Sequence, residues 1–162
     1  MDLAFSPDGA ALVCAIGDGT ATAWDGLALT PKTFAKPSDE MLRTCAYSAD
    51  GAVVAVAGEA KVIFLLDAAT LATAGAVEGA HDGGSINALR FSATGQLASG
   101  GDDKAIKLWG VAPGGASATL VKAVDGAHRA AVMALAVTAT GLASSSGDID
   151  GQGLPNTLSV WT

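Results

Sequence analysis

Aromatic residues are scarce in this chain of 162 residues. Phenylalanine, tryptophan and tyrosine make up 5% of it, although half of all residues are hydrophobic. A core with few large rings must be built from small and β-branched side chains that pack closely, which favours thin sheets stacked face to face. The high hydrophobic content also argues against a disordered chain.

Basic residues are also few. Nine lysines and arginines stand against sixteen aspartates and glutamates, which gives a formal net charge of -7. A surface of that sign repels phosphate backbones and anionic lipid headgroups. We therefore expect no direct binding to nucleic acid or to membranes.

Long apolar runs, a basic leader and closely spaced cysteines are absent from the sequence. The longest apolar runs, Ala52–Ala57 and Val62–Leu66, are far too short to span a bilayer, and the amino end has no basic region of a signal peptide. Cys14 and Cys45 lie in apolar stretches without Cys-x-x-Cys spacing, so we expect buried reduced thiols rather than a disulfide or metal site. These features predict a soluble, intracellular protein of the cytoplasm, with a nuclear location also open.

A repeat is the main feature that the sequence does contain. Four short segments end in a glycine, and these glycines stand 42, 44 and 46 residues apart: Phe5–Gly9, Tyr47–Gly51, Phe91–Gly95 and Val137–Gly141. A period in the forties, with a strand before each turn, is typical of stacked supersecondary units. We expect a single domain over residues 1–162, with repeats at about 1–36, 37–78, 79–125 and 126–162.

The third repeat indicates how one unit folds. Apolar residues predict strands over 86–91, 97–100 and 105–109, and a fourth strand over 117–123 after the break at 113–115. No helical pattern of ten to fifteen residues separates these strands, which excludes βαβ units. Four antiparallel strands in forty-odd residues are typical of a propeller blade.

Polar residues recur at fixed spacings in the last two repeats. The third repeat carries His81, Ser99, Asp103 and Trp109. This set, with Leu108 before the tryptophan, resembles the His, Ser/Thr, Asp, Trp tetrad of the WD-repeat β-propeller family. The fourth repeat gives the same order with seven additional residues between the last two members: His128, Ser144, Asp148 and Trp161.

The first two repeats depart from this pattern. The first keeps Asp18 and Trp24 but has Cys14 at the serine position and no histidine. In the second repeat the aligned positions are all apolar: Val56, Ala60 and Leu66. Replacing three polar positions together leaves no group unsatisfied, so we expect an apolar variant of the blade rather than a weak one. In the complete repeats we expect the ring, hydroxyl and indole groups to form a chain of hydrogen bonds to the aspartate.

The resemblance implies an all-β fold, namely a WD-repeat β-propeller of four blades of antiparallel strands. WD-repeat rings usually have about seven blades, and this sequence stops on a third strand of its last repeat. We therefore expect an open arc, or part of a larger propeller. A closed ring of four blades and a dimer of arcs are the alternatives.

His81, Ser99 and Asp103 also have the composition of a nucleophilic triad. The serines, however, stand in the middle of strands, recur once per repeat and come with a tryptophan, which favours a structural role. No Gly-x-Ser-x-Gly motif, phosphate loop or paired carboxylates stand elsewhere in the sequence. We therefore expect no catalytic residue, no cofactor and no enzyme activity.

The insertion in the last repeat resembles the opening of a calcium loop. Asp148, Asp150 and Gln152 alternate along it, and Gly153 stands where such a loop turns. Ser159, however, stands at the position of the bidentate glutamate, and no helices flank the segment. We expect a loop tip without a bound metal.

The resemblance further implies that the loops with the histidines and aspartates open on one face of the propeller, the top face. Six residues there are candidate partner contacts: Asp82, Asp102, Arg129, Asp150, Gln152 and Asn156. Because this rim is mostly acidic, we expect a basic segment of a partner protein to bind it. The predicted function is a non-catalytic protein–protein interaction scaffold. The alternatives are an enzyme or calcium-dependent binding module that uses residues 148–156 and the top face, and a fragment of a larger WD-repeat protein without independent function.

Overall fold

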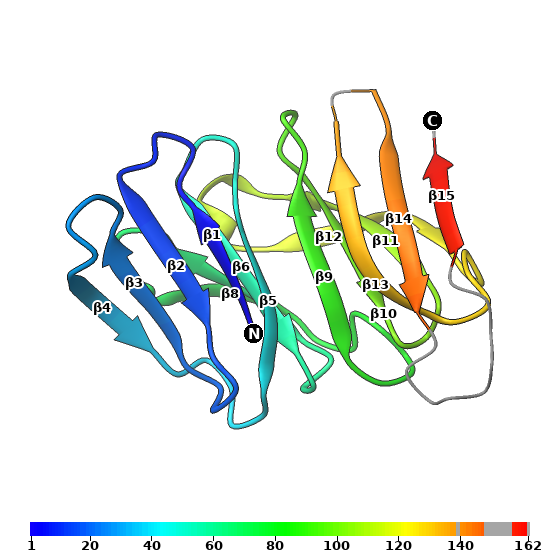
Figure 1. Ribbon diagram of the computed structural model, residues 1–162, viewed down its shortest axis with the longest axis horizontal. Coiled ribbons are helices and arrows are strands. Elements are labelled where there is room, and N and C mark those ends of the chain that lie inside the picture. The colour runs from blue at the N-terminus through cyan, green and yellow to red at the C-terminus, as the bar shows by residue number, and fades with distance from the viewer. Residues whose placement is uncertain (139, 148–156, 162) are drawn as a thin grey trace.

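Strands arranged in four antiparallel sheets make up the fold, as the computed structural model of residues 1–138, 140–147 and 157–161 shows (Figure 1). Blade 1 contains β1 (Asp2–Phe5), β2 (Ala11–Ala15), β3 (Ala21–Asp25) and β4 (Pro31–Ala35). Blade 2 contains β5 (Leu42–Tyr47), β6 (Val53–Gly58), β7 (Ile63–Asp67) and β8 (Thr73–Val77). Blade 3 contains β9 (Ile86–Phe91), β10 (Gln96–Gly101), β11 (Ile106–Val111), the 3-10 turn η1 (Pro113–Gly115) and β12 (Ala118–Val124). Blade 4 contains β13 (Ala131–Val137), β14 (Leu142–Gly147) and β15 (Thr157–Trp161). The all-β class predicted from the sequence is confirmed, and no helix among the described residues is long and apolar enough to cross a bilayer.

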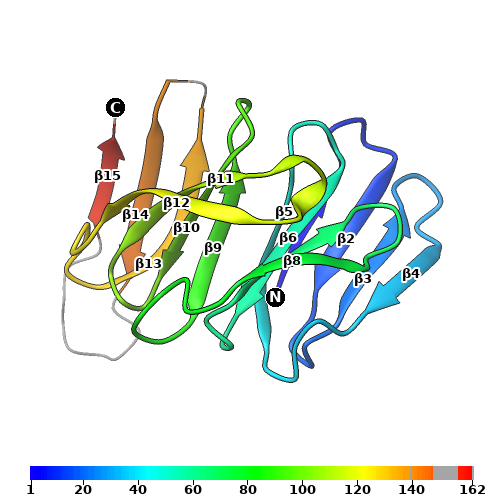
Figure 2. The same cartoon turned by 180° about the vertical axis from the view of Figure 1, so that it is seen from behind.

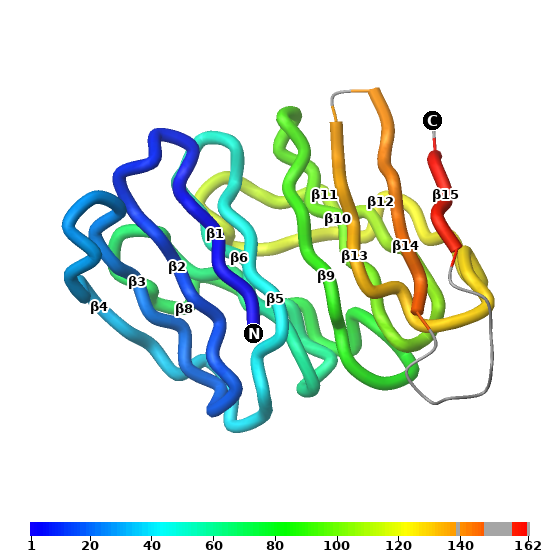
Figure 3. Tube along the Cα trace, viewed as in Figure 1, coloured from blue at the N-terminus to red at the C-terminus, as the bar shows by residue number. Residues whose placement is uncertain are grey.

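The four blades follow one another in chain order along a curved row. Blade 1 lies at one end and blade 4 at the other, in the front view and from behind (Figures 1 and 2). The first strand of each blade contacts that of the next, so β1, β5, β9 and β13 line the inner side of the row. The Cα trace shows the same order of strands (Figure 3). The described blades therefore form an open arc, as the sequence predicts.

The turn after the first strand of each blade explains the glycine period. In blade 1 the Ser6 hydroxyl donates to Asp8 Oδ1 at 2.6 Å and accepts the amide of Ala11 at 2.9 Å. Ser48 and Asp50 form the same pair at 2.6 Å in blade 2. The next residue then takes a left-handed conformation, with φ of 71° at Gly9 and 73° at Gly51, which favours glycine over residues with a Cβ atom. Side-chain hydrogen bonds and backbone conformation together therefore fix these turns.

Three apolar clusters lie between successive blades and hold the row together. Small residues of blade 1, among them Val13, Ala21 and Ala23, pack against Val54, Val56 and Leu66 of blade 2. A second cluster joins blade 2 to blade 3, and a third joins blade 3 to blade 4. Alanine and valine supply much of these clusters, so the sheets approach closely without large rings.

The two cysteines differ in exposure, which corrects one expectation from the sequence. Cys45 is buried, and its burial raises the pKa of the thiol to about 12. Cys14 is only half-buried, although we expected both thiols to be buried. It lies on the face of blade 1 that points away from blade 2, where none of the described residues forms a further blade.

Candidate functional site

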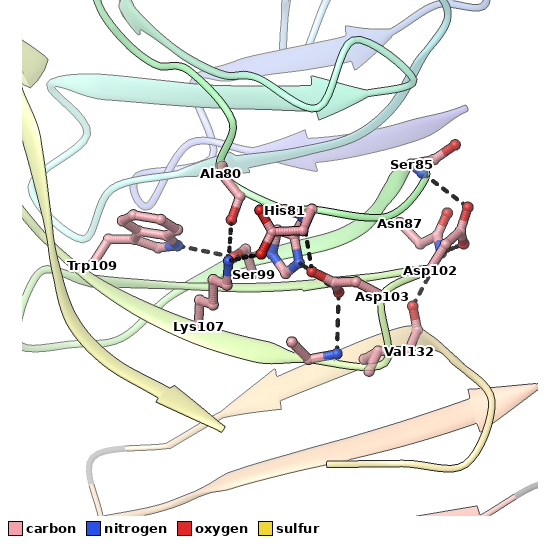
Figure 4. A network of polar contacts seen from close by, with 12 residues as sticks. Ala80, His81, Ser85, Asn87, Ser99, Asp102, Asp103, Lys107, Trp109 and Val132 are labelled. Atoms are coloured by element: carbon pink, nitrogen blue, oxygen red, sulfur yellow. Dashed lines mark hydrogen bonds and ion pairs between the residues drawn. The ribbon is translucent and has the colours of Figure 1, made fainter. Parts of the chain in front are cut away.

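A hydrogen-bonded chain of four side chains links the top of blade 3 to its centre (Figure 4). His81 Nδ1 lies 2.8 Å from Asp103 Oδ1, and its Nε2 lies 2.7 Å from Ser99 Oγ. Trp109 Nε1 donates to the same Ser99 Oγ at 2.9 Å. The Asp103 carboxylate also accepts the backbone amides of Asp82 at 3.2 Å and Ala105 at 3.1 Å. The tetrad therefore ties the loop before β9 to the turn between β10 and β11.

The protonation of His81 follows from its neighbours. A carboxylate can only accept, so Nδ1 carries the proton and donates it to Asp103. Nε2 then accepts the Ser99 hydroxyl, which in turn accepts the Trp109 indole N–H, and every donor has a partner. Burial lowers the pKa of His81, although the adjacent Asp103 opposes this effect. The neutral imidazole is the form that completes the chain.

We expect stability to fall as the pH drops below 7, because burial also lowers the pKa of His128. The unfolded chain takes up protons near its ordinary histidine pKa of 6.5, whereas the folded chain resists them until a lower pH. The melting temperature should therefore decrease from pH 7.5 to pH 5.5. The variant His81→Gln/His128→Gln should melt lower at pH 7.5 and show a flatter profile across that window. An equally steep profile in the variant would contradict this assignment.

Carboxylates with perturbed pKa values do not titrate in that window. Hydrogen bonds lower the pKa of five aspartates below the ordinary value of 3.8: Asp8, Asp18, Asp25, Asp50 and Asp67. Their titration affects stability only at more acidic pH. The profile between pH 7.5 and pH 5.5 therefore reports on the two histidines rather than on these turns.

Blade 4 repeats the inner part of this arrangement. His128 Nε2 lies 2.7 Å from Ser144 Oγ, and Trp161 Nε1 donates to Ser144 Oγ at 2.8 Å. His128 Nδ1 lies 2.6 Å from the hydroxyl of Thr157, a contact that the sequence pattern does not indicate. Asp148, the expected fourth member, lies outside the described residues.

Blades 1 and 2 hold the corresponding positions in other ways. Trp24 Nε1 donates to Thr22 Oγ1 at 3.0 Å, and Asp18 accepts the amide of Thr20 at 2.9 Å. Asp18 and Trp24 therefore make separate local contacts rather than one network. In blade 2, Val56 and Leu66 are fully buried against blade 1, and Ala60 is half-buried at the top.

The burial of the tetrad decides what its serine can do. Ser99 is 0% exposed, and its hydroxyl lies between the imidazole and the indole. A serine nucleophile must meet its substrate and needs an oxyanion hole beside it. The Ser99 hydroxyl is closed to substrate, so this set of residues supports the blade and performs no acyl transfer.

Comparison with known proteins agrees with this geometry. The family model "WD domain, G-beta repeat" matches residues 1–25 and 73–110. The chain is similar to two solved structures over 99% of its length: "Structure of U3-55K", at 25% identity and a TM-score of 0.83, and "Crystal structure of RRP9 WD40 repeats", at 26% identity and 0.82. The chain belongs to the WD-repeat β-propeller family. It spans 47% of each of those two chains, and a comparison with curated proteins gave no match.

The WD-repeat fold is typical of protein-interaction scaffolds, and its loops supply the binding surfaces. We define the top face of this WD-repeat arc by the loops 16–20, 36–41, 59–62, 78–85, 102–105 and 125–130, which lie along the lower edge of Figure 1. These loops contain nine acidic and four basic residues. The described turns at the opposite ends of the strands contain only Asp8 and Asp50 as charged residues. Charge, mostly negative, is therefore concentrated on the top face.

The expected partner contacts differ in how free they are to meet a partner. The Asp82 side chain is 93% exposed, and Arg129 is exposed as well. Asp102 is half-buried, and its carboxylate accepts the Ser85 amide at 2.9 Å and Asn87 Nδ2 at 2.7 Å. The Asp102 carboxylate thus shapes the loop before β9. The other expected contacts, Asp150, Gln152 and Asn156, lie outside the described residues.

The calcium loop that we considered also falls outside the part of the chain that the structure describes. Asp148, Asp150, Gln152 and Gly153 belong to that segment, and Ser159 lies within β15. Among the described residues, no group of three histidine, cysteine, aspartate or glutamate side chains is placed to hold a metal ion.

Two residues that the sequence did not single out support the top face. Lys107 alternates with apolar neighbours and reads as an outward residue, but it is buried, and its Nζ donates to the Ala80 carbonyl at 2.9 Å (Figure 4). Asn87 Nδ2 contacts Asp102 and also the Val132 carbonyl at 3.2 Å, which joins blade 3 to blade 4. A side chain that reaches across a loop or a blade leaves no periodic signal in the sequence.

Proposed function

We propose that this WD-repeat arc is a non-catalytic scaffold whose top face binds a basic segment of a partner protein. The observation that carries the proposal is the excess of acidic residues in the top loops, nine against four, on a chain of net charge -7. Opposite charges across an interface steer association and set its orientation. The rigid tetrads beneath these loops hold the charged groups in place before the partner arrives, which lowers the entropic cost of binding.

Two exposed carboxylates mark where the partner's lysines and arginines would sit. Asp39 is 99% exposed in the loop before β5, and Asp82 is 93% exposed in the loop before β9. Each has one internal cation nearby, Lys36 at 3.1 Å and Lys107 at 3.9 Å respectively. Neither carboxylate is enclosed, so an incoming cation reaches both without breaking the fold.

Titration with a short synthetic peptide of alternating lysine and serine tests the proposal. The variant Asp39→Asn/Asp82→Asn should weaken binding by about 3- to 10-fold, because each exposed ion pair contributes modestly to affinity. Binding should also weaken at higher salt, since exposed charges are screened.

The matched control removes the same amount of charge from the opposite face. The variant Asp8→Asn/Asp50→Asn changes two exposed turn aspartates and should leave peptide affinity unchanged. A peptide of alternating glutamate and serine should not bind. Equal losses in the two variants would show that net charge attracts the peptide without a defined face, and would refute the proposal.

A further inference from the structure

Each contact between blades in this structure joins two different faces. The front face of a blade packs against the preceding blade, and the back face packs against the following one. In blade 3, Leu89, Leu97 and Trp109 form the front face and are at most 5% exposed against blade 2. On its back face, Ala98 and Ile106 are buried against blade 4. The chain repeats this front-to-back contact three times.

Blade 1 presents the same front face without a blade against it. The strand register places four residues at the positions of Leu89, Phe91, Leu97 and Trp109 of blade 3: Leu3, Phe5, Leu12 and Trp24. Leu3 is 60% exposed and Phe5 54% exposed, whereas Leu89 and Leu97 are 0% exposed. These four residues are uncharged and apolar, as an interface core requires. We call them the open front face.

Blade 4 presents the complementary back face. By the same register, Leu158 and Val160 occupy the positions of Ile106 and Leu108 of blade 3, and Ala143 occupies that of Ala98. Leu158 is 75% exposed and Val160 73% exposed, whereas Ile106 is 3% exposed beneath blade 4. We call Ala143, Leu158 and Val160 the open back face. Exposed apolar patches of this kind mark interaction sites.

We propose that a second copy of this chain covers both faces, so that two arcs close head to tail into a ring of eight blades. The two open faces are the two halves of the contact that the chain already makes three times. A second copy brings a back face to the first copy's front face and a front face to its back face. Both new contacts are then equivalent to the internal ones, and the symmetry closes the assembly at two copies.

The shape of the arc supports closure at two copies. The open faces lie at opposite ends of the row (Figures 1 and 2). The arc superposes on 47% of the solved WD40 chain with a TM-score of 0.82, so two arcs correspond to nearly the whole of such a chain. The curvature within one copy is thus the curvature that two copies need to meet at both ends.

Analytical ultracentrifugation of the full chain tests the proposal. The wild-type protein should sediment as a compact species of twice the mass of one chain. Leu3→Lys/Phe5→Lys blocks the open front face, and Leu158→Lys/Val160→Lys blocks the open back face. Each variant alone should sediment as a single chain, because every contact in the ring uses one face of each kind. All four positions are solvent-exposed, and circular dichroism checks that the strands remain.

Mixing the two variants distinguishes this ring from other dimers. The front-blocked variant still has its back face and the back-blocked variant its front face, so the mixture should form a pair held by one intact contact. A dimer that joins two front faces would be insensitive to the back-face substitutions, which would overturn the proposal. A wild-type single chain would show that a different chain covers these faces. A mass that grows steadily with concentration would show an open filament instead of a ring.

Discussion

Trp109→Ala should lower the free energy of unfolding by about 3 to 5 kcal/mol, the largest loss that we expect from a single substitution. Trp109 is 5% exposed and packs in the cluster between blades 2 and 3, where it contributes the one large ring. Truncation removes its buried apolar surface and also the donor to Ser99. Equilibrium unfolding in urea measures the change.

Trp109→Phe separates packing from hydrogen bonding. The phenyl ring keeps most of the buried surface but lacks the indole N–H that donates to Ser99 Oγ at 2.9 Å. We expect this variant to lose only about 1 to 2 kcal/mol. If the alanine variant were no less stable than the phenylalanine variant, the ring would not be packed as the structure shows.

Asp103→Ala should cost about 2 to 4 kcal/mol, because its carboxylate accepts three N–H donors. The side chain is 12% exposed, and the His81 ring beside it is fully buried. Without the carboxylate, the imidazole N–H and the amides of Asp82 and Ala105 lose their acceptor. Urea unfolding gives the loss in stability. The pKa of His81 followed by NMR should fall further, since Asp103 raises it.

Asp103→Asn and Asp82→Ala serve as controls for that prediction. The amide oxygen of asparagine can still accept the His81 proton, so this variant should recover part of the stability. Asp82 is the neighbouring carboxylate with a 93% exposed side chain, and its removal should leave stability within about 0.5 kcal/mol of the wild type. Equal losses for Asp103→Ala and Asp82→Ala would refute the role of the tetrad.

The sequence predicts the blades well because each depends on local chemistry. Phe91 and Gly95 flank a turn whose geometry is written in five residues, and the strand over 86–91 has the bounds expected for it. The tetrad spacing likewise places His81 and Asp103 at the two ends of one hydrogen bond. Short-range patterns therefore carry most of the fold.

Contacts between blades escape this kind of prediction. Asn87 reaches the Val132 carbonyl on the next blade, and Thr157 takes the contact with His128 Nδ1. Both depend on how neighbouring strands are placed in space, which no fixed spacing encodes. The half-burial of Cys14 has the same origin, since the front face of blade 1 has no neighbour among the described residues.

The Asp2 carboxylate contacts three inner strands, and this has a mechanical consequence for the arc. Its Oδ2 accepts from Thr44 Oγ1 at 3.1 Å and from the Cys45 amide at 3.3 Å on β5, and lies 3.5 Å from Arg90 Nη1 on β9. Blades 1 and 3 are thereby held at a set angle about blade 2, close to the axis, where a small displacement would change the opening at the rim most. The arc thus behaves as a stiff bracket rather than a hinge, so whatever completes it meets an opening of fixed width.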